Sequence, residues 1–255
     1  MTARTAAAIV SLSVAAIAVN GCVSFYEIPV ETPIHAKLDV SGFQRVLVAG
    51  FLSGGSNSID PNTETARLLR SQLRTKSELK VVDAEVLSLV EEFDKRRPGG
   101  APPQPDSSDE PRIKNEKDLA EYEKILTDTE YWKKIGEENQ GALIVTGSIL
   151  FTEVSKSGMV SKVGTQTDQY GRPSYGEVRS YSSMKGFSLA PTFVFIDGRT
   201  GQQLHKESFH EEQLYQEGQN TPALSSYFEL MDKLLPGFLN TLSSQKIRGT
   251  RILIK

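Results

Sequence analysis

Cysteine and histidine are scarce in this sequence. Its 255 residues include one Cys and three His. A single Cys excludes an intrachain disulfide framework and any zinc or iron–sulfur site built mainly from thiolates. His205 and His210 are five residues apart in a predicted strand, so their side chains should point to opposite faces and cannot share a metal ion. We therefore expect no metal site and no cofactor.

An excess of basic charge is also missing. The chain has 29 Lys and Arg against 32 Asp and Glu, for a formal net charge of −3. Nucleic-acid binding needs a concentrated basic face, so no nucleic-acid partner is expected.

The common catalytic signatures are absent too. The sequence has no Gly-x-Ser-x-Gly elbow and no His-Glu-x-x-His pair. The Gly-rich residues 53–58 lack the Gly-Lys-Ser/Thr of a phosphate loop, and we interpret them as a flexible connection. These absences predict a protein that is not an enzyme.

The one long apolar run before the body of the chain lies at its start. Residues 6–19 are apolar apart from two serines, follow the single charge of Arg4, and are too short to span a bilayer. This pattern is typical of a secretory signal. We predict a signal peptide over residues 1–21.

The only Cys follows this segment directly, in Ala18-Val19-Asn20-Gly21-Cys22. The aliphatic Val19 three positions before the Cys and the small Gly21 directly before it resemble a bacterial lipobox. That resemblance implies cleavage before Cys22 and its acylation, and two or three acyl chains anchor a protein stably. By analogy with lipoprotein sorting, Val23 in place of Asp favours the outer membrane. Membrane lipid is thus one expected partner, and the protein should face the periplasm.

The rest of the chain divides into a tether and one domain. Residues 22–42 have few apolar clusters and two prolines, which indicates a lipidated, extended tether. Residues 43–255 should form one α/β domain. Residues 95–114 interrupt it with a run rich in Pro, Gly, Ser and acidic residues that cannot bury a core, and we interpret them as a disordered insertion.

The order of periodic segments predicts the fold class. Continuous apolar runs indicate strands buried on both faces, and i, i+3, i+4 spacing indicates helices. We expect strands at 45–51, 79–83, 142–151, 187–196, 204–209 and 251–254, and helices at 60–76, 86–93, about 119–135 and 221–242. Pro191 should mark a bulge or an edge, and Pro236 a kink. The prediction is a mixed α/β fold: a single mixed sheet, parallel early and antiparallel late, with helices packed on it.

A long polar hairpin is expected between residues 152 and 184. Its sequence is rich in Ser, Thr, Gly and Tyr, with a turn at 170–173. Tyr and Arg are favoured in interfaces. The candidate partner-binding residues are Tyr170, Arg172, Tyr175, Arg179 and Tyr181. A solvated ribbon without a partner is the alternative.

The strand motifs resemble the CsgG family of bacterial envelope lipoproteins, with its TolB-N-terminal type of α/β domain. The resemblance is carried by Arg45 to Phe51, by the strand 79–83 and by Gly141 to Ser148, with a looser match at 193–201. It implies a periplasmic domain, often oligomeric, that serves secretion or the assembly of surface structures. A homo-oligomer is therefore a second expected partner, beside other envelope proteins.

Together these features predict a lipid-anchored, non-enzymatic binding or assembly component of the bacterial cell envelope. Two alternatives stay open. One is an oligomeric outer-membrane secretion pore, as the best-known member of that family forms. Each face of the predicted hairpin mixes Lys, Ser or Gly with its apolar residues, which does not match a lipid-facing strand. The other is an envelope hydrolase or carbohydrate-active protein with an unrecognised site.

Overall fold

The computed structural model describes residues 25–97, 112–167, 169–216, 218–219, 222–243 and 245–254. The predicted signal peptide, Cys22 and most of the predicted insertion lie outside these residues. The chain divides into two compact units. One comprises residues 36–243, and the other combines the segments up to His35 and from Ser244. No helix within the described ranges is both long and apolar enough to cross a membrane.

The elements follow one another in an order close to the predicted one. They are β1 (Phe25–Ile34), β2 (Arg45–Gly55), α2 (Pro61–Lys76), β3 (Lys80–Val81), α3 (Leu89–Arg96), α4 (Glu116–Tyr122), the 3-10 helix η1 (Glu123–Thr127), α5 (Thr129–Glu138), β4 (Leu143–Thr167), β5 (Pro173–Asp197), β6 (Gln203–Ser208), β7 (Glu211–Gln216), α6 (Ala223–Leu242) and β8 (Gln245–Ile254).

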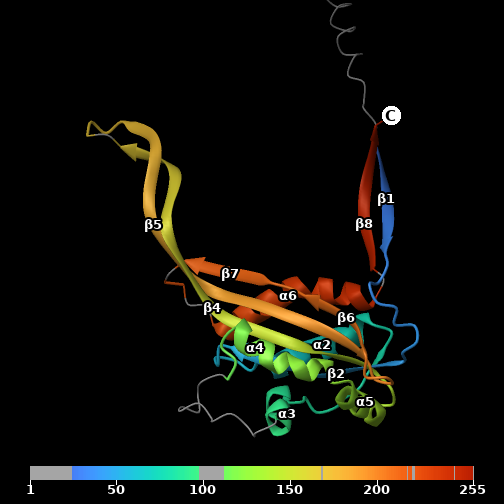
Figure 1. The fold of residues 1–255 in the computed structure, drawn as a ribbon. Coiled ribbons are helices and arrows are strands. Elements are labelled where there is room, and N and C mark those ends of the chain that lie inside the picture. Colours follow the sequence, from blue (N-terminus) through green and yellow to red (C-terminus); the bar gives the residue numbers. More distant parts are fainter. Residues whose placement is uncertain are drawn as a thin grey trace, which may run out of the picture. The chain divides into compact units, whose positions relative to one another are not determined.

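The larger unit is built on one mixed sheet of six strands (Figure 1). Its order is β3-β2-β4-β5-β6, and β7 also pairs with β5. β2 is parallel to β3 and β4, whereas β5 is antiparallel to β4, β6 and β7. The predicted fold class, one mixed sheet with helices packed on it, is confirmed.

Helices cover both faces of this sheet. On one face α2 and α6 pack over alternate strand residues such as Val48, Val145 and Phe193. On the other face α3, α4, η1 and α5 pack over the intervening residues, such as Leu47 and Ile144. The continuous apolar runs of β2 and β4 follow from this arrangement, because both faces of these strands are buried.

Two of the motifs that carried the family resemblance, Arg45 to Phe51 and Gly141 to Ser148, contact each other. The Thr146 hydroxyl donates a 2.7 Å hydrogen bond to the carbonyl of Gly50, where the pairing of β2 with β4 shifts register. Gly50 and Gly147 have positive φ angles of 150° and 146°. A Cβ on Gly147 would lie 1.8 Å from the Thr192 carbonyl oxygen, so no larger residue fits there. These motifs therefore have a structural role in joining the central strands.

The two ends of the chain differ from the prediction. Residues 25–34 form a strand instead of an extended tether, and they pair antiparallel with β8, from Phe25 opposite Ile254 to Ile34 opposite Gln245. The expected strand at 251–254 thus begins earlier and belongs to the other unit instead of closing the main sheet. Extended residues satisfy their backbone groups by pairing, and the chain's other end supplies the partner.

Two smaller expectations are refined. Pro191 has no register shift in its pairing with β4, but it lies between the β6 and β7 pairings of β5, where its missing N–H leaves no donor unpaired. The predicted insertion, 95–114, includes residues with defined structure at both ends. Residues 95 and 96 belong to α3, and Ile113 is buried and accepts a hydrogen bond from the Gly55 N–H at 2.8 Å. α6 continues through Pro236 to Leu242.

Candidate functional site

The most prominent feature of the larger unit is the β4–β5 hairpin, which extends beyond the sheet (Figure 1). Its strands pair without a register shift from Leu143 opposite Asp197 to Thr167 opposite Pro173. In the described chain, β2 pairs with β4 only as far as Phe151, and β7 pairs with β5 only as far as Met184. We call the part of the hairpin beyond these pairings the distal hairpin, and among the described residues neither of its outer edges has a strand partner. Such edges are open to pairing with another chain.

One face of the distal hairpin collects large exposed side chains. Directly opposite residues share a face, as do alternate residues along a strand. Tyr175, Arg179 and Tyr181 of β5 therefore lie on the same face as Met159 and Val163 of β4. The exposed fractions of Met159, Val163, Tyr175 and Tyr181 are 67%, 84%, 81% and 69%. The hairpin face is our name for the five residues Met159, Val163, Tyr175, Arg179 and Tyr181.

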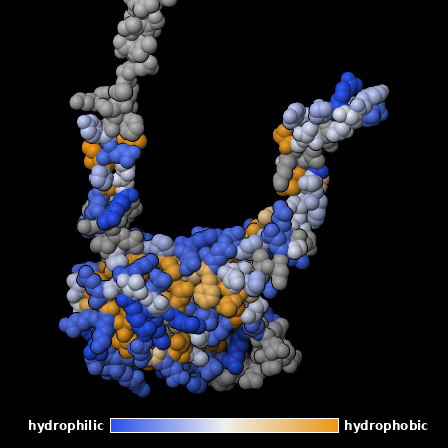
Figure 2. Space-filling model, turned by 180° about the vertical axis from the view of Figure 1, so that it is seen from behind, coloured by the Kyte–Doolittle hydropathy of each residue, from blue (hydrophilic) through white to orange (hydrophobic). Residues whose placement is uncertain are grey.

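The other two predicted residues lie at the tip. Tyr170 is exposed, and the Arg172 guanidinium carbon lies 5.3 Å from the centre of its ring. This cation–π contact joins the two side chains beside the turn at Gly171, whose φ is positive at 76°. The structure thus groups three of the predicted residues on one face and places two at the tip. Figure 2 shows a mainly hydrophilic distal hairpin with separate hydrophobic residues.

Met159 and Val163 were not among the sequence-predicted residues. The sequence held a signal for them, because a hairpin turning near residue 170 pairs residues whose numbers sum to about 340. That relation puts Met159 opposite Tyr181 and Val163 opposite Glu177, as observed.

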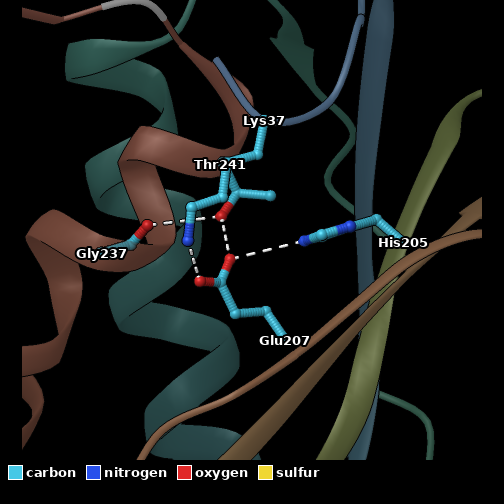
Figure 3. Close-up of polar contacts among 5 residues, drawn as sticks. All are labelled: Lys37, His205, Glu207, Gly237 and Thr241. Carbon is cyan, nitrogen blue, oxygen red and sulfur yellow. Dashed lines mark hydrogen bonds and ion pairs between the residues drawn. The ribbon is translucent and has the colours of Figure 1, made fainter. Parts of the chain in front are cut away.

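A second cluster surrounds the carboxylate of Glu207 in β6 (Figure 3). Lys37 Nζ donates a hydrogen bond to it, and the Thr241 hydroxyl donates another at 2.6 Å. His205 Nε2 lies 3.5 Å from the same carboxylate. The Leu38 N–H also donates to the Thr241 carbonyl at 3.0 Å. The cluster therefore fastens the segment before β2 to the end of α6.

The same contacts set the charge state of Glu207. Its side chain is 16% exposed. Burial by itself would raise the pKa of the Glu207 carboxyl, but the hydrogen bonds from Lys37 and Thr241 outweigh burial and hold the pKa below its ordinary value. Lys37 and Thr241 both donate to the Glu207 carboxylate, which indicates a structural cluster.

Replacing Glu207 with glutamine should lower the free energy of unfolding by about 1–2 kcal/mol at neutral pH, because charge-assisted hydrogen bonds are lost. The pKa of the Glu207 carboxyl in the folded protein lies below 4.5. Its contribution to the free energy of unfolding is therefore complete above pH 4.5 and is lost as the pH falls through the folded pKa. Urea unfolding should show the gap between the parent and E207Q shrinking below about pH 4. Glu78→Gln, at an exposed position, is the control. A gap that does not change with pH would contradict this assignment.

A polar cleft lies beside the carboxyl end of β2, between the first turns of α2 and α3. It has a volume of about 280 Å³ and is lined by residues that include Asp60, Asn62, Ser88 and Arg112. The Asp60 carboxylate accepts the N–H groups of Asn62 and Thr63 at 3.1 and 3.3 Å, and Asn62 accepts the Phe51 N–H at 2.7 Å. Asp60 thus occupies the helix terminus that a phosphate would use. The interpretation of residues 53–58 as a flexible connection is wrong for residues 53–55, which extend β2 and pair with residues 149–151 of β4.

The histidines and the single Trp do not form a site in the part of the chain that is described. No group of three or more His, Cys, Asp or Glu there is arranged to hold a metal ion. Trp132 is fully buried and its indole N–H donates to the Ile125 carbonyl at 2.9 Å, so it packs α5 against η1 and the sheet.

Comparisons with known proteins give little further information. No family model matches the chain, and no curated protein matches its sequence. Among solved structures the chain is similar to the lipoprotein GNA1162 from Neisseria meningitidis, with 15% identity and a TM-score of 0.29 over 77% of this chain and 98% of that chain. Similarity at this level carries no argument about function. The resemblance to the CsgG family therefore stays a prediction.

Proposed function

We propose that this protein is a lipid-anchored component of the bacterial envelope that binds other envelope proteins, or further copies of itself, through the β4–β5 hairpin. It acts by binding and assembly, without catalysis. The anchor is the acylated Cys22 that the sequence predicts, and the protein faces the periplasm from the outer membrane. A role in secretion or surface-structure assembly follows from the resemblance to the CsgG family.

The observation that carries this proposal is the exposure of the hairpin face on a ribbon with two unpaired edges. An isolated two-stranded ribbon is only marginally stable in water. Here the strands leave the sheet and still present Met159, Val163, Tyr175 and Tyr181 to solvent. Aromatic and Met side chains are enriched at interfaces, and open edges add backbone hydrogen bonds to a partner strand. Binding of a partner would cover the exposed side chains and pair the open strand edges.

The absence of catalysis is supported by the way the cleft residues are used. Asp60 and Asn62 already hold the first turn of α2 and the backbone of β2. The Glu207 carboxylate is likewise engaged by Lys37 and Thr241. A hydrolase would need converging polar groups free to act on a substrate.

Photo-crosslinking in cells tests the proposal. A photoactivatable residue at Tyr175 should give discrete crosslinked species in the envelope fraction, whereas one at Ser180, on the opposite face, should give few. Changing Met159, Tyr175 and Tyr181 together to serine should weaken the interaction about tenfold or more, because aromatic contacts often contribute over 1 kcal/mol each.

The matched control changes Val160, Ser180 and Ser182 on the opposite face, and it should bind like the parent. Equal crosslinking from both faces, or none from either, would argue against the hairpin as a binding surface. Ion conductance of the purified protein in planar bilayers would favour the secretion pore instead.

A further inference from the structure

The terminal unit contains, within the residues described, one two-stranded antiparallel ribbon of β1 and β8. Its two faces differ in chemistry. Tyr26, Ile28 and Val30 alternate along β1 and share one face, and Arg251 lies on that face because it pairs with Ile28. Tyr26 and Ile28 are 59% and 44% exposed. Hydrophobic residues are visible on this ribbon in Figure 2.

The opposite face is mainly polar. Its described side chains comprise four polar ones, from Glu27, Glu31, Arg248 and Thr250, and two apolar ones, from Pro29 and Ile252. Arg248 Nε lies 3.0 Å from the Glu31 carboxylate. The ribbon thus separates an apolar row with an arginine from a face bearing two carboxylates. A ribbon of this kind is marginally stable in water unless its apolar side is covered.

The short distance in sequence between Cys22 and β1 indicates what covers the apolar side of the ribbon. Phe25 begins β1 only three residues after Cys22. Three residues span at most about 11 Å, even when fully extended. If Cys22 is acylated, its thioether lies at the lipid surface, and the start of the ribbon is held within that distance of the same surface.

We propose that the face of the β1–β8 ribbon that carries Tyr26, Ile28 and Val30 rests on the phospholipid leaflet beside the acylated Cys22. This inference rests on the anchoring at Cys22 proposed above. Tyr suits the membrane interface because its ring is apolar and its hydroxyl polar. The Arg251 guanidinium can bind lipid phosphates, which arginine recognises with paired N–H donors. Glu27 and Glu31 face away from the anionic lipids.

Tryptophan scanning in vesicles tests this placement. The full chain, purified after acylation in cells, is reconstituted into vesicles of phosphatidylethanolamine and phosphatidylglycerol, with or without brominated acyl chains. Tyr26→Trp is compared with Glu27→Trp, its neighbour on the opposite face. The emission of Trp132 is a common background, because this residue is fully buried.

We expect brominated lipid to reduce the added emission at position 26 about twofold and to leave position 27 nearly unchanged, because interfacial apolar faces lie about 5–10 Å into the leaflet. Equal quenching at both positions in acylated protein would overturn the inference and leave the anchoring intact, whether the face is solvated or covered by a second copy. Absence of acyl mass on the purified chain would overturn both the anchoring and the placement of the ribbon.

Discussion

Replacing Phe193 with alanine should lower the free energy of unfolding by about 3–5 kcal/mol. Phe193 is 1% exposed in β5. Its ring centre lies 6.0 Å from that of Phe51 in β2, 5.8 Å from Phe209 and 4.8 Å from Phe238 in α6. The substitution therefore leaves a cavity where two strands and a helix meet, and rigid neighbouring rings cannot collapse into it.

Urea unfolding of the unacylated chain, followed by the fluorescence of Trp132, measures this loss. Tyr175→Ala is the matched control, since it truncates an aromatic residue of the same strand that is 81% exposed. It should change the free energy by less than about 0.5 kcal/mol. A loss below about 1 kcal/mol for Phe193→Ala would show that this aromatic cluster does not hold α6 on the sheet.

Replacing Cys22 with serine should abolish palmitate labelling and remove the mature chain from the membrane fraction. Serine offers no thiol to acylate, and each buried methylene of an acyl chain contributes about 0.8 kcal/mol to membrane binding. The product should be released from membranes or accumulate as unprocessed precursor.

Metabolic labelling with radioactive palmitate and fractionation of the envelope measure both effects. Ser24→Ala, two residues away, should label and fractionate like the parent. If the parent chain itself takes up no palmitate, the predicted lipobox is wrong and the proposed location has no support.

Local signals in the sequence were sufficient for the core elements. Continuous apolar runs marked β2 and the buried half of β4, and Asp60-Pro61 marked the start of α2, where the Asp60 carboxylate accepts two backbone N–H groups. α3 began later than its spacing predicted. The Leu87 N–H donates to the Ala49 carbonyl at 2.8 Å, and the Leu87 carbonyl accepts from the Asn62 side chain, so the residues just before Leu89 lie outside the helix.

The pairing of strands far apart in the sequence could not be predicted from such local signals. β1 and β8 are joined by contacts such as Glu31 with Arg248, 217 positions apart. Neither segment alone shows which partner it takes, because open edges accept many strands. The hairpin face was found only in part for a similar reason. The residues of β5 were recognised by type, whereas those of β4 required the register of pairing.

The unbroken ladder of β4 and β5 has a mechanical consequence. From Ser155 to Thr167 the hairpin reaches about 40 Å. Its backbone hydrogen bonds continue without interruption to Val145 and Phe195. Val145 and Phe195 belong to the hydrophobic core. Any load that a bound partner places on the hairpin would therefore act on strands whose inner ends are buried in that core.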